Sequence, residues 1–378
     1  MPSHRRPAAV TLASALALAT ACAHPQPSAT AGSDMVFELA ASFIVPSPPI
    51  EAKGPQFNGI SALAPLRDGR EMLALSDDRE DSRVYRIGFE WTTTGTRVKP
   101  LQTILFQRGG AAPAVLDPEG LAVTRDGHML VSSEGVGNQE PRLPPALIEY
   151  GPDGRFVRQL PLRPRYVPNE RGEPTTGVRA NAGFEGLTLS PDYSKLFTAA
   201  ELPLIQDGAA DPFRPSRTRL LEYEAVGDSY KPAREFVYEL APLEPVDYPH
   251  RFAINGVVEL LALDDREMLV MERGFVESTD RTQTINRIRI FRISIAGATD
   301  VSGYDSLRDA SGATPVSKTL VLDVNRARGL DPRLSDLDNF EGMAWGPPLT
   351  RGGKRPLVLV SDDNESVRQV TAFLLFKR

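Results

Sequence analysis

Short apolar strands separated by polar turns make up almost the whole chain from Met35 onward. The clearest example is residues 183–201, GFEGLTLSPDYSKLFTAAE, where an acidic residue and a glycine precede an apolar strand, a polar turn, a second apolar strand and a carboxylate. Short apolar runs bounded by turn residues are typical of β-strands, and beyond the N-terminal segment no helical period continues over about ten residues. Recurrence of this unit predicts a repeat architecture.

The unit occurs five times, with copies that begin near residues 57, 117, 183, 254 and 339. Each of the first four copies is followed by two further strands, whereas the fifth is followed by one, at 370–376. The strand at 36–45 has no hairpin partner beside it in the sequence. We therefore predict an all-β protein, a single β-propeller of five four-stranded blades, closed by pairing of strand 36–45 with strand 370–376. Six blades remain possible, because the stretches 161–182 and 202–218 could contain a degenerate blade.

The first residues are typical of a secretory signal. Arg5 and Arg6 precede a short apolar stretch at 8–19, which is too short for a transmembrane helix. The sequence LATAC that ends at Cys22 resembles the lipobox of bacterial lipoproteins, and Cys22 is the single cysteine of the chain. We predict a signal peptide at 1–21, a lipidated Cys22, a flexible tether at 22–34 and a propeller domain at 35–378. The alternative is an ordinary signal peptide in which Cys22 has no role.

These features predict an exported protein, located in the bacterial periplasm or at the outer membrane, that touches the membrane only through a lipid anchor. The 378 residues carry a formal net charge of -6 and show no basic stripe, which argues against nucleic acid as a partner. A monomer is expected.

Side chains at equivalent points of the five copies should converge around the central channel of a propeller. The residue before the glycine at the entrance of each inner strand is Asn58, Glu119, Glu185, Asn255 or Glu341. The second strand of each copy ends in Asp77-Asp78, Glu134, Glu201, Glu272 or Asp362-Asp363. We therefore expect a funnel of carboxylates at one end of the channel.

Like charges in a cluster raise one another's pKa, so such a cluster usually holds a cation or shares protons. Carboxylate and amide oxygens suit Ca²⁺, and histidine is too scarce for a transition-metal site. The expected metal ligands are Asn58, Asp77, Glu119, Glu134, Glu185, Glu201, Glu341 and Asp362. The alternative is that these residues form turns and strand caps, each solvated or paired with arginine.

Arginines accompany the acids, and Arg79, Arg251 and Arg273 are candidates to bind an anionic substrate in bidentate fashion. Their alternative role is to neutralise acidic neighbours. The sequence contains no G-x-S-x-G nucleophile motif, P-loop or dinucleotide-binding glycine motif.

The repeats resemble those of the phytase-like family of secreted bacterial proteins, which is described by the esterase-like activity of phytase. The matching stretches are NGISAL with LSDD (58–63, 75–78), DPEGLA with SE (117–122, 133–134), GFEGLTLSPD with AE (183–192, 200–201), and NFEGMA with LVSDDN (339–344, 359–364). The resemblance extends over about residues 55–376 and implies a calcium-dependent phosphoester hydrolase on a propeller.

From these observations we expect a metal-dependent phosphoester or ester hydrolase that acts on a small anionic substrate, with a phosphorylated molecule as the first candidate. Glu119, Glu185 and Glu341 are the expected catalytic residues, which together with Asp77 would hold the cation that activates water. Two alternatives are a propeller that only binds a ligand or partner in the cell envelope, and a calcium-dependent lactonase-like hydrolase.

Overall fold

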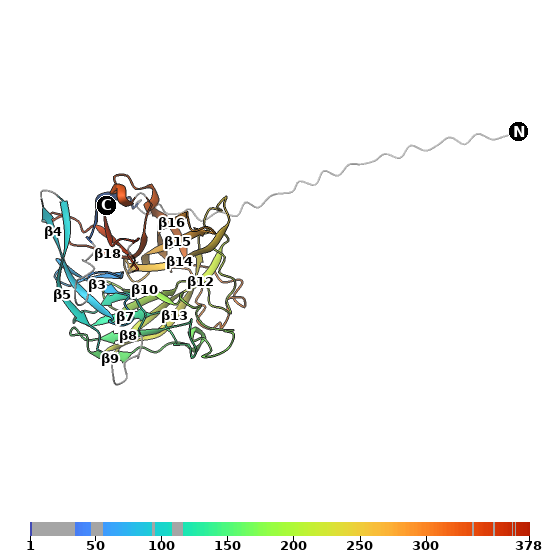
Figure 1. Cartoon of the computed structure of the whole chain (residues 1–378). Helices are drawn as coiled ribbons and strands as arrows, with labels where there is room; N and C mark the ends of the chain where they lie inside the picture. The colour runs from blue at the N-terminus through green and yellow to red at the C-terminus, as the bar shows by residue number, and fades with distance from the viewer. Residues whose placement is uncertain are drawn as a thin grey trace. The chain divides into compact units, whose positions relative to one another are not determined.

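Five four-stranded antiparallel sheets form the domain from Met35 to Arg378 and are arranged in a ring, as the repeats predict (Figure 1). The computed structural model describes Met1 and residues 35–46, 56–92, 95–107, 116–334, 336–350, 352–364, 366 and 368–378. The predicted signal peptide after Met1, Cys22 and the predicted tether lie outside the described residues. The prediction of a β-propeller with five blades is confirmed.

Each blade contains four strands. In the first four blades these strands follow one another in the sequence from the channel outward. Blade 1 contains β2 (Ile60–Pro65), β3 (Glu71–Ser76), β4 (Arg83–Thr92) and β5 (Gly95–Leu105). Blade 2 contains β6 (Pro118–Val123), β7 (Met129–Ser133), β8 (Ala146–Tyr150) and β9 (Phe156–Gln159). Blade 3 contains β10 (Phe184–Leu189), β11 (Lys195–Ala200), β12 (Ser216–Val226) and β13 (Ser229–Leu240). Blade 4 contains β14 (His250–Ala262), β15 (Glu267–Ser278), β16 (Thr284–Ser294) and β17 (Ser317–Asp323).

Blade 5 joins the two ends of the domain. Its inner three strands are β18 (Asn339–Trp345), β19 (Leu357–Asp362) and β20 (Ala372–Lys377), and its outermost strand is β1 (Glu38–Ile44). Strand β1 pairs antiparallel with β20, and the rings of Phe43 and Phe373 stack with centroids 5.4 Å apart. The predicted closure of the ring is therefore confirmed, and it covers an edge that would otherwise be open.

The two long stretches that could have held a sixth blade contain no further sheet. Residues 161–182 include the 3-10 turn η1 (Pro164–Tyr166) and an isolated bridge between Arg179 and Ala182. Residues 202–215 contain no strand. Two other 3-10 turns are η2 (Val324–Arg326) and η3 (Pro332–Leu334), and the described residues contain no α-helix. None of the described segments therefore forms a helix that could span a membrane.

Hydrophobic cores lie between neighbouring blades and close a cycle. For example, Ile60 and Tyr85 of blade 1 belong to the same buried cluster as Val360 and Phe373 of blade 5. Four other clusters join blades 1 and 2, 2 and 3, 3 and 4, and 4 and 5. The innermost strands β2, β6, β10, β14 and β18 also contact one another in order, and β18 contacts β2. This packing fixes the inner strands around one axis.

The inner strands of blade 4 are longer than those of the other blades. Strand β14 has 13 residues and β15 has 12, whereas β2, β6 and β10 have 6 each. Val257 of β14 pairs with Glu272, and Ile60, the first residue of β2, pairs with Ser76. Each pair lies directly before the register shift of its inner strand, so Val257 is the equivalent of Ile60. Residues 250–256 therefore extend blade 4 beyond the level at which β2 begins.

Candidate active site

The backbone pairing of the inner hairpins aligns one side chain from each blade at the mouth of the channel. Glu201, directly after β11, donates its backbone N–H to the carbonyl of Gly183 over 2.9 Å, and the same bond recurs in blades 1 and 2. The registers of blades 4 and 5 place Arg273 and Asp362 at the equivalent position. We call these five residues the hairpin ring: Asp77, Glu134, Glu201, Arg273 and Asp362.

A second set of side chains comes from a β-bulge that every inner strand carries. The register shifts directly after Ile60 in β2 and directly after the equivalent residue of each other inner strand. A bulge breaks the regular alternation of a strand and redirects a side chain. The residues that begin these bulges form the bulge ring: Ser61, Glu119, Glu185, Val258 and Glu341.

The two rings meet in a cavity of about 1050 Å³. All five residues of the hairpin ring line it, as do the three glutamates of the bulge ring. Every carboxylate that the sequence predicted as a metal ligand therefore lies in this cavity, and so do the predicted catalytic residues Glu119, Glu185 and Glu341.

Asn58 and Arg251 are placed elsewhere. Asn58 does not line the cavity, and its Oδ1 accepts a hydrogen bond from Nη2 of Arg83 at 3.1 Å. The sequence comparison aligned Asn58 with Glu119, whereas the strand register makes Ser61 the equivalent of Glu119. Arg251 does not line the cavity either, and its Nη2 lies 2.5 Å from Oε2 of Glu277.

Glu272 also differs from its expected position at the mouth. Glu272 of β15 pairs with Val257 of β14 and directly precedes Arg273. The side chains of Glu272 and Arg273 therefore point to opposite faces of the sheet. Arg273 takes the place in the hairpin ring that a carboxylate takes in the other four blades. The repeat therefore supplies four acids and one arginine to this ring.

Burial and mutual repulsion raise the pKa of several of these carboxyl groups. Burial contributes most for Glu185, and the charges of Glu134, Glu119 and Glu201 raise its pKa further. The same two causes raise the pKa of Glu119 and of Glu134. Burial raises the pKa of Glu201 to about 8, although the nearby Arg273 lowers it. Groups with such shifts in a concave site are candidates for binding and proton transfer.

Two of the arginines that line the cavity, Arg79 and Arg273, are already engaged with acids. Arg79 makes a bidentate pair with Asp117, with Nε to Oδ1 at 2.6 Å and Nη2 to Oδ2 at 2.5 Å. Nη1 of Arg273 donates to Oε1 of Glu341, and Nη2 lies 3.9 Å from Oε1 of Glu201. Burial opposes the charge of Arg273, but the neighbouring glutamates outweigh this effect and raise its pKa. Of the three predicted substrate-binding arginines, Arg79 and Arg273 therefore stay positively charged at the cavity wall.

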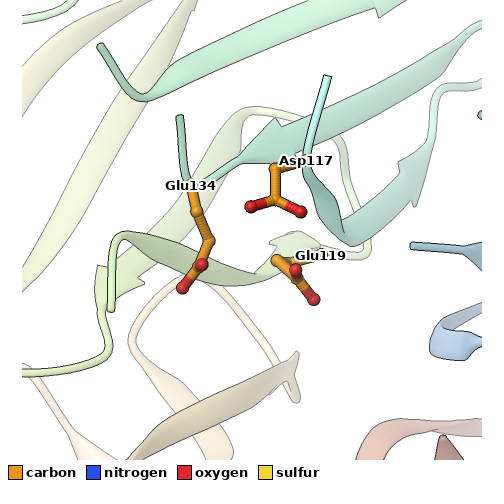
Figure 2. Close-up of side chains that lie close together, drawn as sticks. All are labelled: Asp117, Glu119 and Glu134. Carbon is orange, nitrogen blue, oxygen red and sulfur yellow. The ribbon is translucent and has the colours of Figure 1, made fainter. Parts of the chain in front are cut away.

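Two groups of oxygens have the spacing of a cation site. One oxygen from each of Asp117, Glu119 and Glu134 lies within 4.8 Å of the others, and Figure 2 shows these side chains together. Glu134, Glu185 and Glu201 form the second group at the same spacing, so Glu134 is common to both. Oε1 of Glu201 is buried and has no hydrogen-bond partner among the described residues. This all-oxygen set, with a buried oxygen left without a donor, fits a hard divalent cation such as Ca²⁺.

Sequence reasoning missed two acidic residues near the axis. Asp117 lies directly before β6 and belongs to the first oxygen group. Glu259 is 2% exposed, and its carboxylate accepts backbone N–H groups of Leu260, Met343 and Leu187. Burial nevertheless raises its pKa well above the usual value. Glu259 aligns with Gly186 of β10. Four repeats have glycine or alanine at this position and only the fourth has glutamate, and this difference was the signal that could have identified Glu259.

Curated and solved proteins show limited similarity to this chain. A secreted protein of uncharacterised function from Arthroderma benhamiae is 28% identical over 147 residues, a match that covers 33% of this chain and only 27% of that protein. A gluconolactonase from Xanthomonas campestris is 10% identical and aligns over 85% of this chain and 86% of its own with a TM-score of 0.34. A putative 6-phosphogluconolactonase from Bacteroides uniformis is 15% identical and aligns over 84% and 85% of the two chains with a TM-score of 0.35. At these TM-scores neither structure bears on the chemistry of the site.

The family comparison is more extensive. The model of the phytase-like family, described as "esterase-like activity of phytase", matches residues 55–365. This range includes both rings and every carboxylate of the two oxygen groups. The chain therefore belongs to the phytase-like family.

Proposed function

We propose that this protein is an exported hydrolase that cleaves a small ester or phosphoester at the mouth of its propeller channel, with a divalent cation held by the two rings. The observation that carries the proposal is the second oxygen group: Glu134, Glu185 and Glu201 are each less than 8% exposed, and all three have raised pKa values. Burying like charges together is costly unless a cation or protons compensate them.

The cation would be held by Glu134, which both oxygen groups share, together with Glu185, Glu201, Asp117 and Glu119. Asp77, Glu341 and Asp362 line the same cavity and can complete its shell directly or through water. A bound divalent cation would polarise the ester or phosphoryl oxygen and lower the pKa of a water molecule. Ca²⁺ is the first candidate because all these donors are oxygens.

The chain's own residues supply proton transfer and charge stabilisation. Burial and the neighbouring carboxylates raise the pKa of Glu119 and of Glu185, which makes the ionised form of each a stronger base than an exposed glutamate. Either residue can therefore accept a proton from the attacking water and return it to the leaving oxygen. Arg273 and Arg79 carry fixed positive charges at the cavity wall, where they can stabilise the negative charge that develops on the reacting group.

Export follows from the predicted signal peptide, and the similarity to a secreted protein supports it. Within this proposal Cys22 carries a lipid that retains the domain at the bacterial envelope, and the protein acts as a monomer on a small anionic molecule.

The test is an assay of purified protein against phytate, p-nitrophenyl phosphate, p-nitrophenyl acetate and a lactone, each with Ca²⁺ and with chelator. We expect turnover of at least one substrate with Ca²⁺, its loss in chelator, and a decrease of at least about 100-fold in Glu185→Gln. Glu224→Gln, an exposed acid on β12, is the matched control and should behave as wild type.

The substrate panel also separates the alternatives. Turnover of the lactone alone identifies a lactonase-like enzyme, and ester turnover that is insensitive to chelator contradicts the role of the cation. If no substrate is turned over while Ca²⁺ still raises the melting temperature, the protein is a binding propeller.

A further inference from the structure

The cavity has two chemically different walls. Its lining includes ten Asp or Glu residues and three Arg residues, most of which belong to the rings or follow strands of blades 1, 2 and 5. The side formed by blade 4 and the loop residues 202–212 carries no acidic residue of the lining, and its polar members are Arg273, Asn255 and Asn286, beside which an apolar surface lies. This blade-four wall comprises Leu202, Pro212, Phe252, Ile254 and Phe275.

The extension of blade 4 builds this wall. Ile254 of β14 lies directly opposite Phe275 of β15, so their side chains share one face of the sheet. Phe252 is two residues before Ile254, and its ring centroid lies 6.1 Å from that of Phe275 at an angle of 49°. Phe252 is 47% exposed, so its ring adds apolar surface that is open to the cavity.

The opposite face of the same extension is covered by protein. Leu243 is 5% exposed and packs against Gly274. A Cβ atom added to Gly274 would lie only 2.3 Å from Cδ2 of Leu243. Val276, which alternates with Phe275 along β15, is 2% exposed. Only the face toward the cavity is left uncovered, so the apolar surface is part of the cavity wall.

Arg273 joins the two walls. It belongs to the hairpin ring and lies two residues before Phe275 on the same face of β15, about 7 Å away along the strand. A reacting group held at Arg273 and the carboxylates would therefore place one of its substituents against Phe275 and Phe252.

The charge of the lining also limits the substrate. The lining has ten acids against three arginines, so a phosphate beyond the reach of the bound cation would face more carboxylates than cations. A molecule with one reacting ester or phosphoester and an uncharged remainder avoids this repulsion.

We propose that the substrate is an ester or phosphomonoester with an aromatic-sized apolar substituent, which lies on the blade-four wall while the reacting group lies at the rings. This inference rests on the proposed function for the position of the reacting group. It makes Phe252 and Phe275 specificity residues, and it distinguishes the substrate from a polyphosphorylated sugar or polyol.

The test measures binding by calorimetry, with Ca²⁺ present, for two pairs of ligands that share a head group: phenylphosphonate with methylphosphonate, and benzoate with acetate. In at least one pair we expect the phenyl ligand to bind about 10-fold more tightly. Phe252→Ala should reduce this preference to about 2-fold while leaving the affinity for the methyl ligand unchanged. Leu320→Ala on β17 is the matched control, since Leu320 is 48% exposed in the same blade and lies outside the cavity.

Equal affinities within both pairs, or an unchanged preference in both Phe252→Ala and Phe275→Ala, would overturn the inference, as would the absence of binding by all four ligands. The proposed function is judged separately. A phenyl preference without turnover of phenyl phosphate or phenyl acetate supports the apolar wall and contradicts the hydrolase. Turnover of phenyl and methyl esters with equal kcat/KM supports the hydrolase and overturns the apolar wall.

Discussion

Glu201 of blade 3 and Glu272 of blade 4 are alike in sequence but opposite in surroundings. Each directly follows the apolar run of a second strand in the sequence, and each is at most 2% exposed. Glu272 accepts hydrogen bonds from the hydroxyl of Tyr238 at 2.9 Å, from Nζ of Lys318, and from Nη2 of Arg289 at 3.4 Å. Glu201 faces other glutamates, and its Oε1 has no hydrogen-bond partner among the described residues. One cation is near it, because Nη2 of Arg273 lies 3.9 Å from this oxygen, beyond hydrogen-bond distance.

The difference shows how burial alone fails to identify a functional carboxylate. A buried acid surrounded by cations and donors is part of the structure, since its charge is compensated within the protein. A buried acid among other acids is destabilising by itself, and such groups are typical of sites that bind ions or transfer protons. The predictions below test this distinction.

The largest effect is expected where a compensated charge is removed. Glu272→Gln leaves Lys318 and Arg289 next to a buried neutral group, so we expect the free energy of unfolding to fall by about 3–5 kcal/mol in chemical denaturation. Glu267→Gln is the matched control on the same strand. Glu267 pairs with Arg292 with both side chains 30% exposed, so a loss of at most about 1 kcal/mol is expected. Equal losses in the two variants would remove the distinction between Glu272 and a surface pair.

The second effect is the gain that a cation should give to the uncompensated acids. Ca²⁺ at about 100 times its dissociation constant should raise the free energy of unfolding of the wild type by about 2.7 kcal/mol. Differential scanning calorimetry should show a higher melting temperature that is lost in Glu201→Gln and retained in Glu267→Gln. A shift that is the same in Glu201→Gln as in the wild type would contradict the assignment of Glu201 to the cation site.

Without a cation, the third effect is a dependence of stability on pH. The pKa of Glu201 is about 8 in the folded protein against an ordinary value of 4.5, so the folded state holds this proton more tightly than the unfolded state. The resulting stabilisation is full below pH 4.5 and is lost as the pH rises toward 8.

In chelator, therefore, Glu201→Gln should become more stable relative to the wild type as the pH rises from 6.5 to 9. The expected gain is about 2 kcal/mol, since about 1.5 pH units of this range lie below the folded pKa of about 8 and each unit corresponds to about 1.4 kcal/mol. Denaturation at intervals of half a pH unit measures this difference. Parallel stability curves for the two proteins would show that Glu201 is compensated as Glu272 is.

The fold was predictable because repetition supplies independent copies of the same evidence. Five hairpin patterns gave the number of blades, and an unpaired first strand opposite an incomplete last blade gave the closure. Strand ends were less predictable: the second strand of the fourth copy was expected to end at Glu272, whereas β15 continues to Ser278. That extension depends on tertiary contacts, such as Leu243 against Gly274, which local propensity does not contain.

The site was predictable to within three residues, and that margin decided which side chains enter the cavity. Successive residues of a strand face opposite sides, so aligning Glu272 in place of Arg273 exchanges a buried structural acid for a cavity residue. Asn58 was misaligned for a related reason, because the bulge after Ile60 sets the register and no local sequence signal reveals it. Aligning the five repeats on the glycine at the entrance of each inner strand could not reveal these differences in register.

The smallest expected change in stability and activity concerns Arg251, whose ion pair is more exposed than the contacts of Glu201 and Glu272. The sequence predicted that Arg251 binds substrate, whereas the structure pairs it with Glu277, with the two side chains 43% and 16% exposed. An exposed pair contributes little, so Arg251→Met should lower the free energy of unfolding by at most about 1 kcal/mol. We also expect its KM to equal that of the wild type, whereas Arg273→Met, which removes a charge from the hairpin ring, should raise KM or lower kcat. A KM raised about 10-fold in Arg251→Met alone would instead support substrate binding by Arg251, and would show that partial exposure within an ion pair does not exclude a role in the site.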